Sequence, residues 1–427
     1  MRLLEDEVNQ LLDKEVKMWK QWSKVAWLRD GDRNSRFFHS KTSQRRRRNY
    51  ITKLHDANGG WCSSQDQVNA TIVDFYQTLF TSGNPSNFEE VIETIPHVIT
   101  DEMNDVLIVE FHIKEVEVAL KQMAPLKAPG LDGMHPLFYQ SYWSLLGSDV
   151  STIILHYLNL GSLPQALGHS FITLIPKVKD PTYVSEFRLI SLSNVLYRIF
   201  AKVLTNRLQA IMPNLISEHQ SEFLFDRLIS NNILVAFETM HYIQNHNQGK
   251  SGFMALKLDM SKAYDRVEWE YMERVMIKMG FHARWIQLVM MCITTTSYLV
   301  LINGEPHGHI TPTRGLRQGD PLSPYFFLMC TEGHHGLINK AAHNGDIRGV
   351  SLCRNGPRIT HLFFADDSLF FCRAREEECQ SLLEVLAKYE KAFGKQINRT
   401  KTTIFFSKST NADTQITIQN LLGVNVV

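Results

Sequence analysis

Apolar residues recur along the N-terminal part of this chain at intervals that match one face of a helix. Residues 1–28 follow this spacing with charges on the opposite face, and residues 68–80 return to it. Both stretches therefore predict packing helices. Between them, Asn58-Gly59 is a strong turn signal and predicts a hairpin turn over residues 55–60.

The middle and C-terminal parts alternate between strand-like and helix-like patterns. Residues 81–104 are polar and contain Pro85 and Pro96, so we expect a linker and a domain boundary there. Beyond it, strands and helices mix irregularly, which favours an α+β fold over a doubly wound sheet. Helices are predicted over residues 137–160, 194–208, 232–244, 268–279 and 376–393, and strands over residues 171–175, 253–258 and 298–302, the last pairing through Asn303-Gly304 with the strand that follows.

Composition marks an ordinary globular protein. The chain has 427 residues, 44% of them hydrophobic, which suggests two or three subdomains. The N-terminus is acidic early and no apolar run could span a bilayer, so we expect a soluble, intracellular protein with no membrane partner. The six cysteines lack a Cys-x-x-Cys pair and matching His spacing, which argues against a structural zinc site and for a reducing compartment.

The net charge is only +1, so a protein that binds nucleic acid would need clustered basic residues. The densest cluster is Arg45, Arg46, Arg47 and Arg48. Two interpretations stand side by side. The run is a solvated loop, or it contacts phosphate, for which the arginine side chain has suitable geometry.

Two adjacent carboxylates, Asp366 and Asp367, lie between two runs of large apolar residues. Phe-rich runs of this kind predict buried β-strands. Burying two ionised carboxylates beside such strands costs much free energy unless a cation meets them. We therefore expect a hairpin whose tip presents both aspartates to a divalent metal, an arrangement that points to phosphoryl transfer.

A metal of this kind needs ligands from a second strand. Asp259 ends the apolar segment Ala255 to Leu258 and is the best partner, although an aspartate here could also cap the following helix. Asp265 ranks below it, because it can pair with Arg266 or cap a turn. Tyr264, five residues after Asp259, could line a pocket or pack in the core.

The segment Thr313 to Pro324 combines turn-forming residues with a polar face. Gly315 and Gly319 permit close backbone approach to a ligand, and residues typical of a helix follow. A loop that leads into a helix N-terminus suits a phosphate or a nucleotide, whereas the alternative is a surface turn.

Together these motifs resemble the reverse transcriptase of non-LTR (LINE-type) retrotransposons, in the form common in plant genomes. The resemblance runs in one order from about residue 19 to about residue 407, and the ordered set is far more specific than any one motif. The segments that carry it are Leu174 to Lys177, Phe187 to Leu192, Leu258 to Asp265, Arg314 to Pro324, Phe364 to Asp367, and Gly394 to Asn398 with Lys401.

The resemblance implies an RNA-directed DNA polymerase that adds deoxynucleotides to a primer 3′-end by two-metal phosphoryl transfer. It implies an α+β right-hand fold with fingers and palm, here with a helical N-terminal extension and no complete thumb. The expected parts are a helical, basic extension with its linker (1–104), a fingers-like region (105–252) and a palm (253–427). The implied cofactor is a pair of Mg²⁺ ions, or Mn²⁺. The implied partners are an RNA template, a DNA primer, deoxynucleoside triphosphates and a separate endonuclease.

The resemblance also assigns catalytic residues. Asp259, Asp366 and Asp367 match the metal-binding carboxylates of the family. Tyr264 matches the aromatic gate that excludes a ribose 2′-hydroxyl, and Lys401 matches a palm lysine that assists the pyrophosphate leaving group.

Substrate contacts are assigned in the same way. Lys177 and Arg188 match the fingers residues that clamp the incoming triphosphate, a task that suits two cations. Gln318 and Gly319 match the loop that contacts template and nucleotide.

Several positions depart from the family pattern. Leu131 and Leu189 stand where proline is expected, and His334 stands where an apolar residue is usual. The segment Ser221 to Arg227 departs from the usual Ser-Ala-Phe-Val-Pro-Gly-Arg, with Asp226 in place of glycine, and Asn231 replaces an aspartate. None of these positions is one of the three metal carboxylates.

These departures, and a chain that stops at Val427 soon after the palm, support a second hypothesis. The protein would then be an inactive retrotransposon relic that binds nucleic acid weakly through its basic run. Without a thumb, we expect a primer-template duplex to be held poorly.

Overall fold

The computed structural model describes residues 2–23, 35–85, 88–225, 227–247, 252–394, 397–398 and 401–426. Contacts divide the chain into two units. Unit 1 comprises Met1–Phe75, Thr173–Leu189 and Val300–His307, and unit 2 comprises Tyr76–Ile172, Ile190–Leu299 and Gly308–Val427.

Unit 1 holds the N-terminal helices and a small hairpin. Leu54 pairs with Cys62 in the antiparallel hairpin, which confirms the turn predicted over residues 55–60. The helix predicted over 1–28 is confirmed up to its described end, and residues 24–28 lie outside the described residues. The elements are α1 (Arg2–Ser23), α2 (Ser35–Asn49), β1 (Leu54–His55), β2 (Trp61–Cys62), most of α3 (Gln65–Phe80) and the 3₁₀ turn η1 (Val184–Glu186).

A four-stranded sheet has the order β4-β3-β6-β7, and each of its strands has residues in both units. The strand predicted over residues 171–175 and the hairpin predicted through Asn303-Gly304 are both confirmed. Asn303 has the left-handed conformation (φ 56°) that a tight turn requires. The strands are β3 (His169–Pro176), β4 (Phe187–Ser193), β6 (Ser297–Ile302) and β7 (Glu305–Ile310).

Unit 2 is rich in helices, and the helices predicted over residues 232–244, 268–279 and 376–393 are confirmed within three residues at each end. The stretch predicted over residues 137–160 forms two helices that separate at Tyr142, and the helix predicted over residues 194–208 extends to Leu215. Its helices are α4 (Glu89–Ile92), α5 (Asp101–Ile108), α6 (Ile113–Lys121), α7 (Pro136–Ser141), α8 (Trp143–Leu160), α9 (Gln165–Gly168), α10 (Val195–Leu215), α11 (Ile229–Asn245), η2 (Tyr264–Arg266), α12 (Trp269–Met279), α13 (Ala283–Thr294), α14 (Ser323–Asn344), α15 (Glu376–Phe393) and α16 (Ala412–Leu422). None of the described helices is long and apolar enough to cross a membrane.

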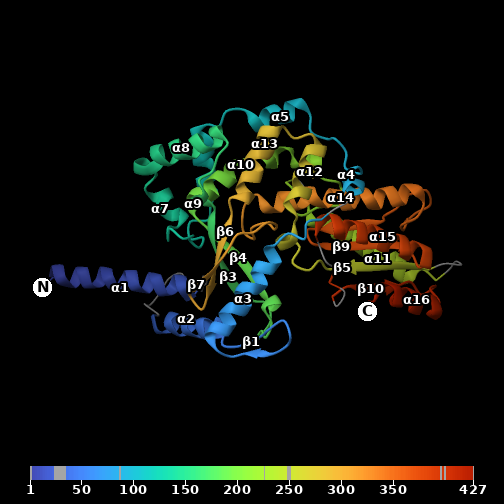
Figure 1. The fold of residues 1–427 in the computed structure, drawn as a ribbon, viewed down its shortest axis with the longest axis horizontal. Helices are drawn as coiled ribbons and strands as arrows, with labels where there is room; N and C mark the ends of the chain where they lie inside the picture. Colours follow the sequence, from blue (N-terminus) through green and yellow to red (C-terminus); the bar gives the residue numbers. More distant parts are fainter. Residues whose placement is uncertain are drawn as a thin grey trace. The chain divides into compact units, whose positions relative to one another are not determined.

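A five-stranded sheet in the order β11-β10-β5-β9-β8 is the framework of unit 2. Successive residues of its central strand point to opposite faces. Met254 and Leu256 therefore enter the main core, while Ala255 packs in a second core with Ile243 of α11. Figure 1 shows α11 and α15 beside this sheet. The strands are β5 (Phe253–Leu258), β8 (His361–Phe364), β9 (Asp367–Arg373), β10 (Thr403–Phe406) and β11 (Asn425–Val426).

The linker predicted over residues 81–104 is wrong for its central part. Phe88, Val91 and Ile92 are buried in the main core, as are Ile95 and Ile99. The short helix α4 packs against α12, α14 and α15. Its apolar residues are too few to show a period, so only tertiary packing reveals that they belong to the core.

Candidate active site

Three carboxylates lie at one end of the five-stranded sheet. Leu258, the last residue of β5, pairs with Ser368 of β9, so Asp259 continues toward the loop of the β8–β9 hairpin. Phe364 pairs with Asp367 across that hairpin, which leaves Ala365 and Asp366 as its loop. The antiparallel register therefore brings Asp259 to the same end of the sheet as Asp366 and Asp367, as the sequence predicted.

The environment of Asp259 ties it to the segment before β10. Asn398 donates its side-chain Nδ2 to Asp259 Oδ2 at 3.1 Å, and Lys401 Nζ lies 3.7 Å from the same oxygen. The Asn398 backbone N–H donates to the Asp259 carbonyl at 2.9 Å. The alternative role as a helix cap is wrong, because the next helical turn, η2, has Ala263 as its N-cap.

The aspartates of the hairpin are not buried. Asp366 is exposed, and the Asp367 side chain is 49% exposed with Lys257 Nζ at 3.6 Å from its Oδ1. The strands do run into the core, but the turn carries the carboxylates out of it. The cost of burying two charges, which the sequence suggested, is therefore not incurred, and a surface ion pair of this kind contributes less than about 1 kcal/mol.

Gln220 holds the hairpin turn in place from the segment between α10 and α11. Its side chain is completely buried, and its Oε1 accepts the backbone N–H of Ala365 at 3.3 Å and that of Glu222 at 3.1 Å. Ala365 has a left-handed φ of 49°, which an alanine adopts at a cost of about 1 kcal/mol. The hydrogen bond from Gln220 helps to offset that strain.

Glu222 and Tyr264 complete the surroundings of the aspartates. Burial, and after it the negative charges of Asp366 and Asp367, raises the pKa of the Glu222 carboxyl. Burial, Asp366 and Glu222 likewise raise the pKa of the Tyr264 hydroxyl. The Tyr264 ring stacks on Phe327 of α14, with centroids 4.5 Å apart and planes 9° from parallel. Tyr264 is therefore fixed beside the carboxylates by an aromatic neighbour.

The arginines of the loop before α14 are structural anchors. Arg314 donates its Nε to the Leu79 carbonyl at 2.8 Å and forms a buried pair with Glu268 at 3.2 Å. Arg317 is 2% exposed and donates to the Gly168 carbonyl and the Thr296 hydroxyl. Both guanidinium groups are buried in unit 2 and bond to other residues there, so neither faces solvent as a phosphate ligand would.

The outer part of the same loop is accessible. Gln318 is half-buried and its carbonyl accepts the Ser191 N–H at 3.0 Å. Gly319 is exposed with a φ of 106°, a conformation that favours glycine, and its carbonyl accepts from Lys127 Nζ at 3.3 Å. The Leu316 N–H donates to the Tyr264 carbonyl at 2.8 Å, which joins this loop to the segment beside the carboxylates.

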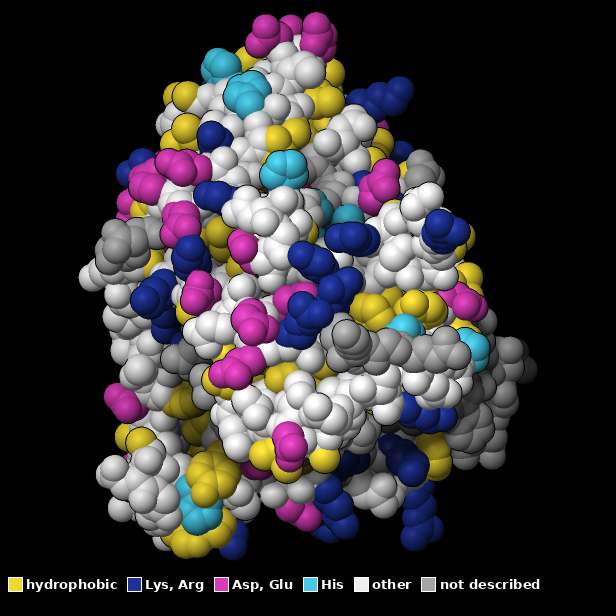
Figure 2. All heavy atoms as spheres, turned by 90° about the vertical axis from the view of Figure 1, so that its right-hand side faces the viewer, with side chains coloured by type: hydrophobic (Ala, Val, Ile, Leu, Met, Phe, Trp, Pro, Cys, Tyr) yellow, Lys and Arg dark blue, Asp and Glu magenta, His cyan; other side chains and the backbone are white. Residues whose placement is uncertain are grey.

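The remaining predicted residues belong to unit 1. Lys177 and Arg188 are both exposed, and Lys177 donates its backbone N–H to the Glu186 carbonyl at 2.8 Å. The run from Arg45 to Arg48 is exposed and forms the end of α2 rather than a loop, with basic charges where the helix dipole favours them. Figure 2 shows basic and acidic side chains interspersed on one face of the molecule, in keeping with the net charge of +1.

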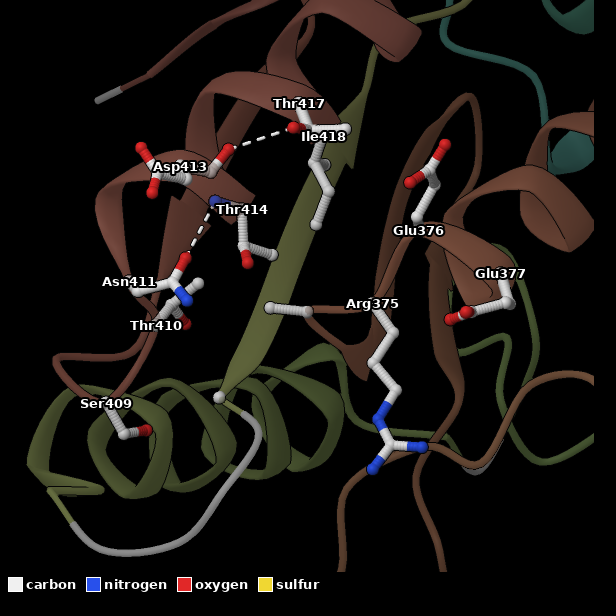
Figure 3. Close-up of a pocket in the computed structure, with 12 residues that line it drawn as sticks. Arg375, Glu376, Glu377, Ser409, Thr410, Asn411, Asp413, Thr414, Thr417 and Ile418 are labelled. Carbon is white, nitrogen blue, oxygen red and sulfur yellow. Dashed lines mark hydrogen bonds between the residues drawn. The ribbon is translucent and has the colours of Figure 1, made fainter.

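A pocket of about 440 Å³ lies at the start of β5, the end of the strand remote from Asp259. Figure 3 shows Arg375 and Glu376 on one side of it and residues of α16 on the other. Asn411 caps α16 there by accepting the Thr414 N–H. None of the predicted site residues lines this pocket, so the carboxylate end of the sheet is the better candidate for chemistry.

Residues 175–426 match the family model described as reverse transcriptase (RNA-dependent DNA polymerase). This match covers more than half of the chain. The chain belongs to the reverse transcriptase family. The mixed architecture of helices and sheets is consistent with the fold of that family.

Relatives from retrotransposons support the same identification. The chain is 27% identical over 398 residues to the transposon TX1 uncharacterized 149 kDa protein of Xenopus laevis, covering 92% of this chain and 29% of that protein. It is 24% identical over 302 residues to the retrovirus-related Pol polyprotein of the type-1 retrotransposable element R2 of Popillia japonica. That match covers 68% of this chain and 38% of the polyprotein. An uncharacterized mitochondrial protein of Arabidopsis thaliana is 56% identical over 70 residues, which cover 16% of this chain and 57% of that protein.

The chain thus spans about a third of the length of its retrotransposon relatives. These relatives support a reverse transcriptase domain of the non-LTR type, and they do not favour an inactive relic.

Reverse transcriptases generally use divalent metal ions, and the carboxylate end of the sheet fits such ions. Carboxylate oxygens are the hard ligands that Mg²⁺ prefers, and Asp259 and the two hairpin aspartates supply them from two sequence motifs. Lys401 and Lys257 are the cations that lie beside Asp259 and Asp367. Both lysine side chains are more than half exposed and can move aside at little cost.

Sequence reasoning missed the parts played by Gln220 and Glu222. Both lie in a segment without regular structure, so no periodicity points to them. The signal that was present is the departure from the family pattern, since an acidic residue stands where alanine is usual. Asp226, which stands in place of glycine in this segment, lies outside the described residues.

Proposed function

We propose that this reverse transcriptase domain extends a DNA primer on an RNA template by two-metal phosphoryl transfer at the carboxylate end of the five-stranded sheet. The observation that carries the proposal is the convergence of Asp259 with the hairpin loop of Asp366 and Asp367. In this reading, residues 253–427 form the palm, residues 105–252 a fingers-like region and residues 1–104 a helical extension. The similarity to an Arabidopsis protein favours a plant source.

Each carboxylate has a proposed role. Asp259, Asp366 and Asp367 would hold two Mg²⁺ ions, or Mn²⁺, with Asp367 in a supporting role. When bound, such ions stabilise the negative charge that develops during phosphoryl transfer. Tyr264, held flat against Phe327, would form the wall of the nucleotide site that excludes a ribose 2′-hydroxyl.

The proposed cations act on the phosphates. Lys401, 3.7 Å from Asp259, would assist the departing pyrophosphate. Lys177 and Arg188 would clamp the incoming triphosphate, as exposed cations can do. Gln318 and Gly319 would contact template and nucleotide.

A primer-extension assay on an RNA template tests the proposal. We expect the wild-type chain to incorporate deoxynucleotides in the presence of Mg²⁺, and Asp366→Ala to lose at least about 100-fold in rate, which corresponds to about 2.7 kcal/mol of activation free energy. Asp149→Ala is the matched control, because Asp149 is an exposed carboxylate on α8. This variant should retain the wild-type rate.

Two outcomes would contradict the proposal in different ways. Equal incorporation by the wild-type chain and Asp366→Ala would rule out the mechanism. Salt-sensitive RNA binding without incorporation by the wild-type chain would instead support the inactive relic.

A further inference from the structure

Three histidines from separate parts of unit 2 converge on one point. His219 lies in the segment between α10 and α11, His335 lies on α14, and His361 begins β8. Their ring nitrogens include a set that lies within 4.8 Å of one another. Among the described residues, this is the group of His, Cys, Asp or Glu side chains whose spacing suits a metal ion.

Neighbouring side chains orient the rings. Thr360 Oγ1 lies 2.8 Å from His361 Nδ1, and Asn339 Nδ2 lies 2.7 Å from His335 Nε2. These outer partners leave His361 Nε2 and His335 Nδ1 facing each other at 2.8 Å. Hydrogen bonds to the outer nitrogens of imidazole ligands are typical of metal sites, where they fix the ring and its tautomer.

The third ring supplies a buried nitrogen. His219 Nδ1 has no hydrogen-bond partner among the described residues, although it is shielded from solvent. A buried polar atom left without a partner costs about 1–3 kcal/mol, so a ligand for this nitrogen would be favourable. The His219 backbone is held firmly, because its carbonyl accepts the Phe363 N–H at 2.8 Å and Asn232 Nδ2 at 3.0 Å.

We propose that His219, His335 and His361 bind one divalent transition-metal ion of the zinc class. Imidazole suits Zn²⁺ and related ions, whereas Mg²⁺ prefers oxygen ligands, so this site is chemically distinct from the carboxylates. Three histidines leave a fourth position for water. The absence of a Cys-x-x-Cys pair, which argued against structural zinc, does not bear on a site built from histidines.

Metal binding would require all three imidazole side chains to adjust. Two nitrogens bound to one tetrahedral Zn²⁺ lie about 3.3 Å apart, so the close His335–His361 pair would open by about 0.5 Å. His219 would turn its ring away from His361, on which it stacks at 4.5 Å. Binding through His335 Nδ1 places the ring proton on Nε2, and a turn of the Asn339 amide would let its oxygen accept that proton.

The ion would clamp the strand that carries the hairpin turn. His361 is the first of the four residues of β8, and Asp366 lies two residues beyond the end of that strand. His219 is followed directly by Gln220, which holds the turn through Ala365. A metal at the histidines would therefore join α14, β8 and the segment before α11 into one support beneath the carboxylates. Burial lowers the pKa of all three imidazoles, which keeps them in the neutral form that binds metals.

Metal titration of the chelator-treated chain tests this site without any polymerase assay. Zn²⁺ is titrated calorimetrically and Co²⁺ spectroscopically, both in excess Mg²⁺ so that the carboxylates do not compete. We expect one equivalent to bind with micromolar or tighter affinity, visible cobalt bands of a four-coordinate site, and a rise in Tm of several degrees. His335→Gln should weaken binding at least tenfold.

His343→Gln is the matched control, since His343 lies exposed near the end of the same helix. It should bind the metal like the wild-type chain. The proposal is overturned if the wild-type chain shows no saturable binding, or if His335→Gln binds as tightly as His343→Gln. Should circular dichroism show that His335→Gln is unfolded, His219→Gln is judged by the same tenfold criterion.

Discussion

Two charged regions of unit 2 come from motifs of the same family, but one exposes its charged side chains and the other buries them. The carboxylate turn, Ala365 to Asp367, carries its charges at the surface, where Asp367 pairs with a lysine that is half exposed. Arg317 and Asp320 in the loop before α14 are both nearly inaccessible, with 2% and 4% of their side chains exposed. Asp320 also accepts a hydrogen bond from the Tyr197 hydroxyl at 2.6 Å.

The comparison distinguishes charged residues that can bind a metal or substrate from charged residues that stabilise the fold, although both belong to motifs of the same family. A surface charge with weakly held partners can exchange them for a metal or a substrate at little cost. A buried charge with fixed partners cannot, because losing one partner leaves the other uncompensated in the interior. We therefore expect substitutions of Arg317 and Asp320 to act on stability, and substitutions of the aspartates in the turn to act on catalysis.

The largest effect should follow from Arg317→Met. Methionine has a similar length but leaves Asp320 as a buried charge without its arginine, 3.9 Å away in the wild-type chain. We expect the free energy of unfolding to fall by about 3–5 kcal/mol. Chemical denaturation monitored by circular dichroism measures this change.

Two controls sharpen the result. Arg354→Met removes an exposed arginine and should change stability by less than about 0.5 kcal/mol. The double variant with Asp320→Asn should recover part of the loss, because no uncompensated charge remains. A loss below about 1 kcal/mol for Arg317→Met would mean that the loop charges are not structural.

Acid should destabilise the interior through the buried histidines. Burial, and after it the charge of His219, lowers the pKa of His335 from 6.5 to about 4. Between these values the unfolded chain takes up a proton that the folded chain does not, so stability falls as the pH falls. For His335 alone, the loss at pH 4 relative to pH 7 is on the order of 3 kcal/mol.

Denaturation curves from pH 7 to pH 4 in the presence of a chelator measure this dependence. His335→Gln should have a flatter profile, since glutamine does not titrate, and His343→Gln should keep the wild-type slope. Parallel profiles for the wild-type chain and His335→Gln would exclude His335 as a source of the acid sensitivity.

The sequence predicts the carboxylates but not the histidines, and the reason is physical. Asp259 and Asp366 each end an apolar run, so their position beside a sheet follows from local pattern alone. His219, His335 and His361 show no common spacing. The bridge between Gln220 and Phe363 brings His219 to β8, and His335 of α14 meets His361 there. Site residues that end a continuous apolar run can therefore be predicted from the sequence, whereas histidines that share no motif cannot.

The elements of the core could also be predicted only where the local sequence pattern is continuous. The strand predicted over residues 253–258 has those bounds in the structure, because its apolar run is continuous. Phe88 and Val91 were missed, because a single helical turn followed by a proline shows no period. The three-part division of the chain into extension, fingers and palm stays a prediction.

Gln220→Met should produce a smaller effect on stability and also affect catalysis. Methionine fills a similar volume but cannot accept the N–H groups of Ala365 and Glu222. We expect a loss of about 1–2 kcal/mol in the free energy of unfolding, together with a lower rate of primer extension. The rate should fall because the left-handed Ala365 loses the bond that supports it.

Gln287→Met is the control for the chemical change, because Gln287 is exposed on α13. It should leave both stability and rate unaltered. A Gln220→Met variant that is destabilised but extends primers at the wild-type rate would show that the hydrogen bond supports the fold and not the geometry of the turn.

The smallest effect on stability should come from Asp366→Asn, although it removes a residue proposed for catalysis. Asp366 is exposed, and its charge acts unfavourably on the nearby Glu222 carboxylate. We expect the free energy of unfolding to change by less than about 0.5 kcal/mol, in the stabilising direction, because asparagine removes that repulsion. Asp149→Asn, measured in the same denaturation series, is the control for replacing an exposed carboxylate. If Asp366→Asn instead lowered the free energy of unfolding by more than about 1 kcal/mol, the carboxylate turn would stabilise the fold as the buried loop charges do. The two regions would then not differ in the way proposed here.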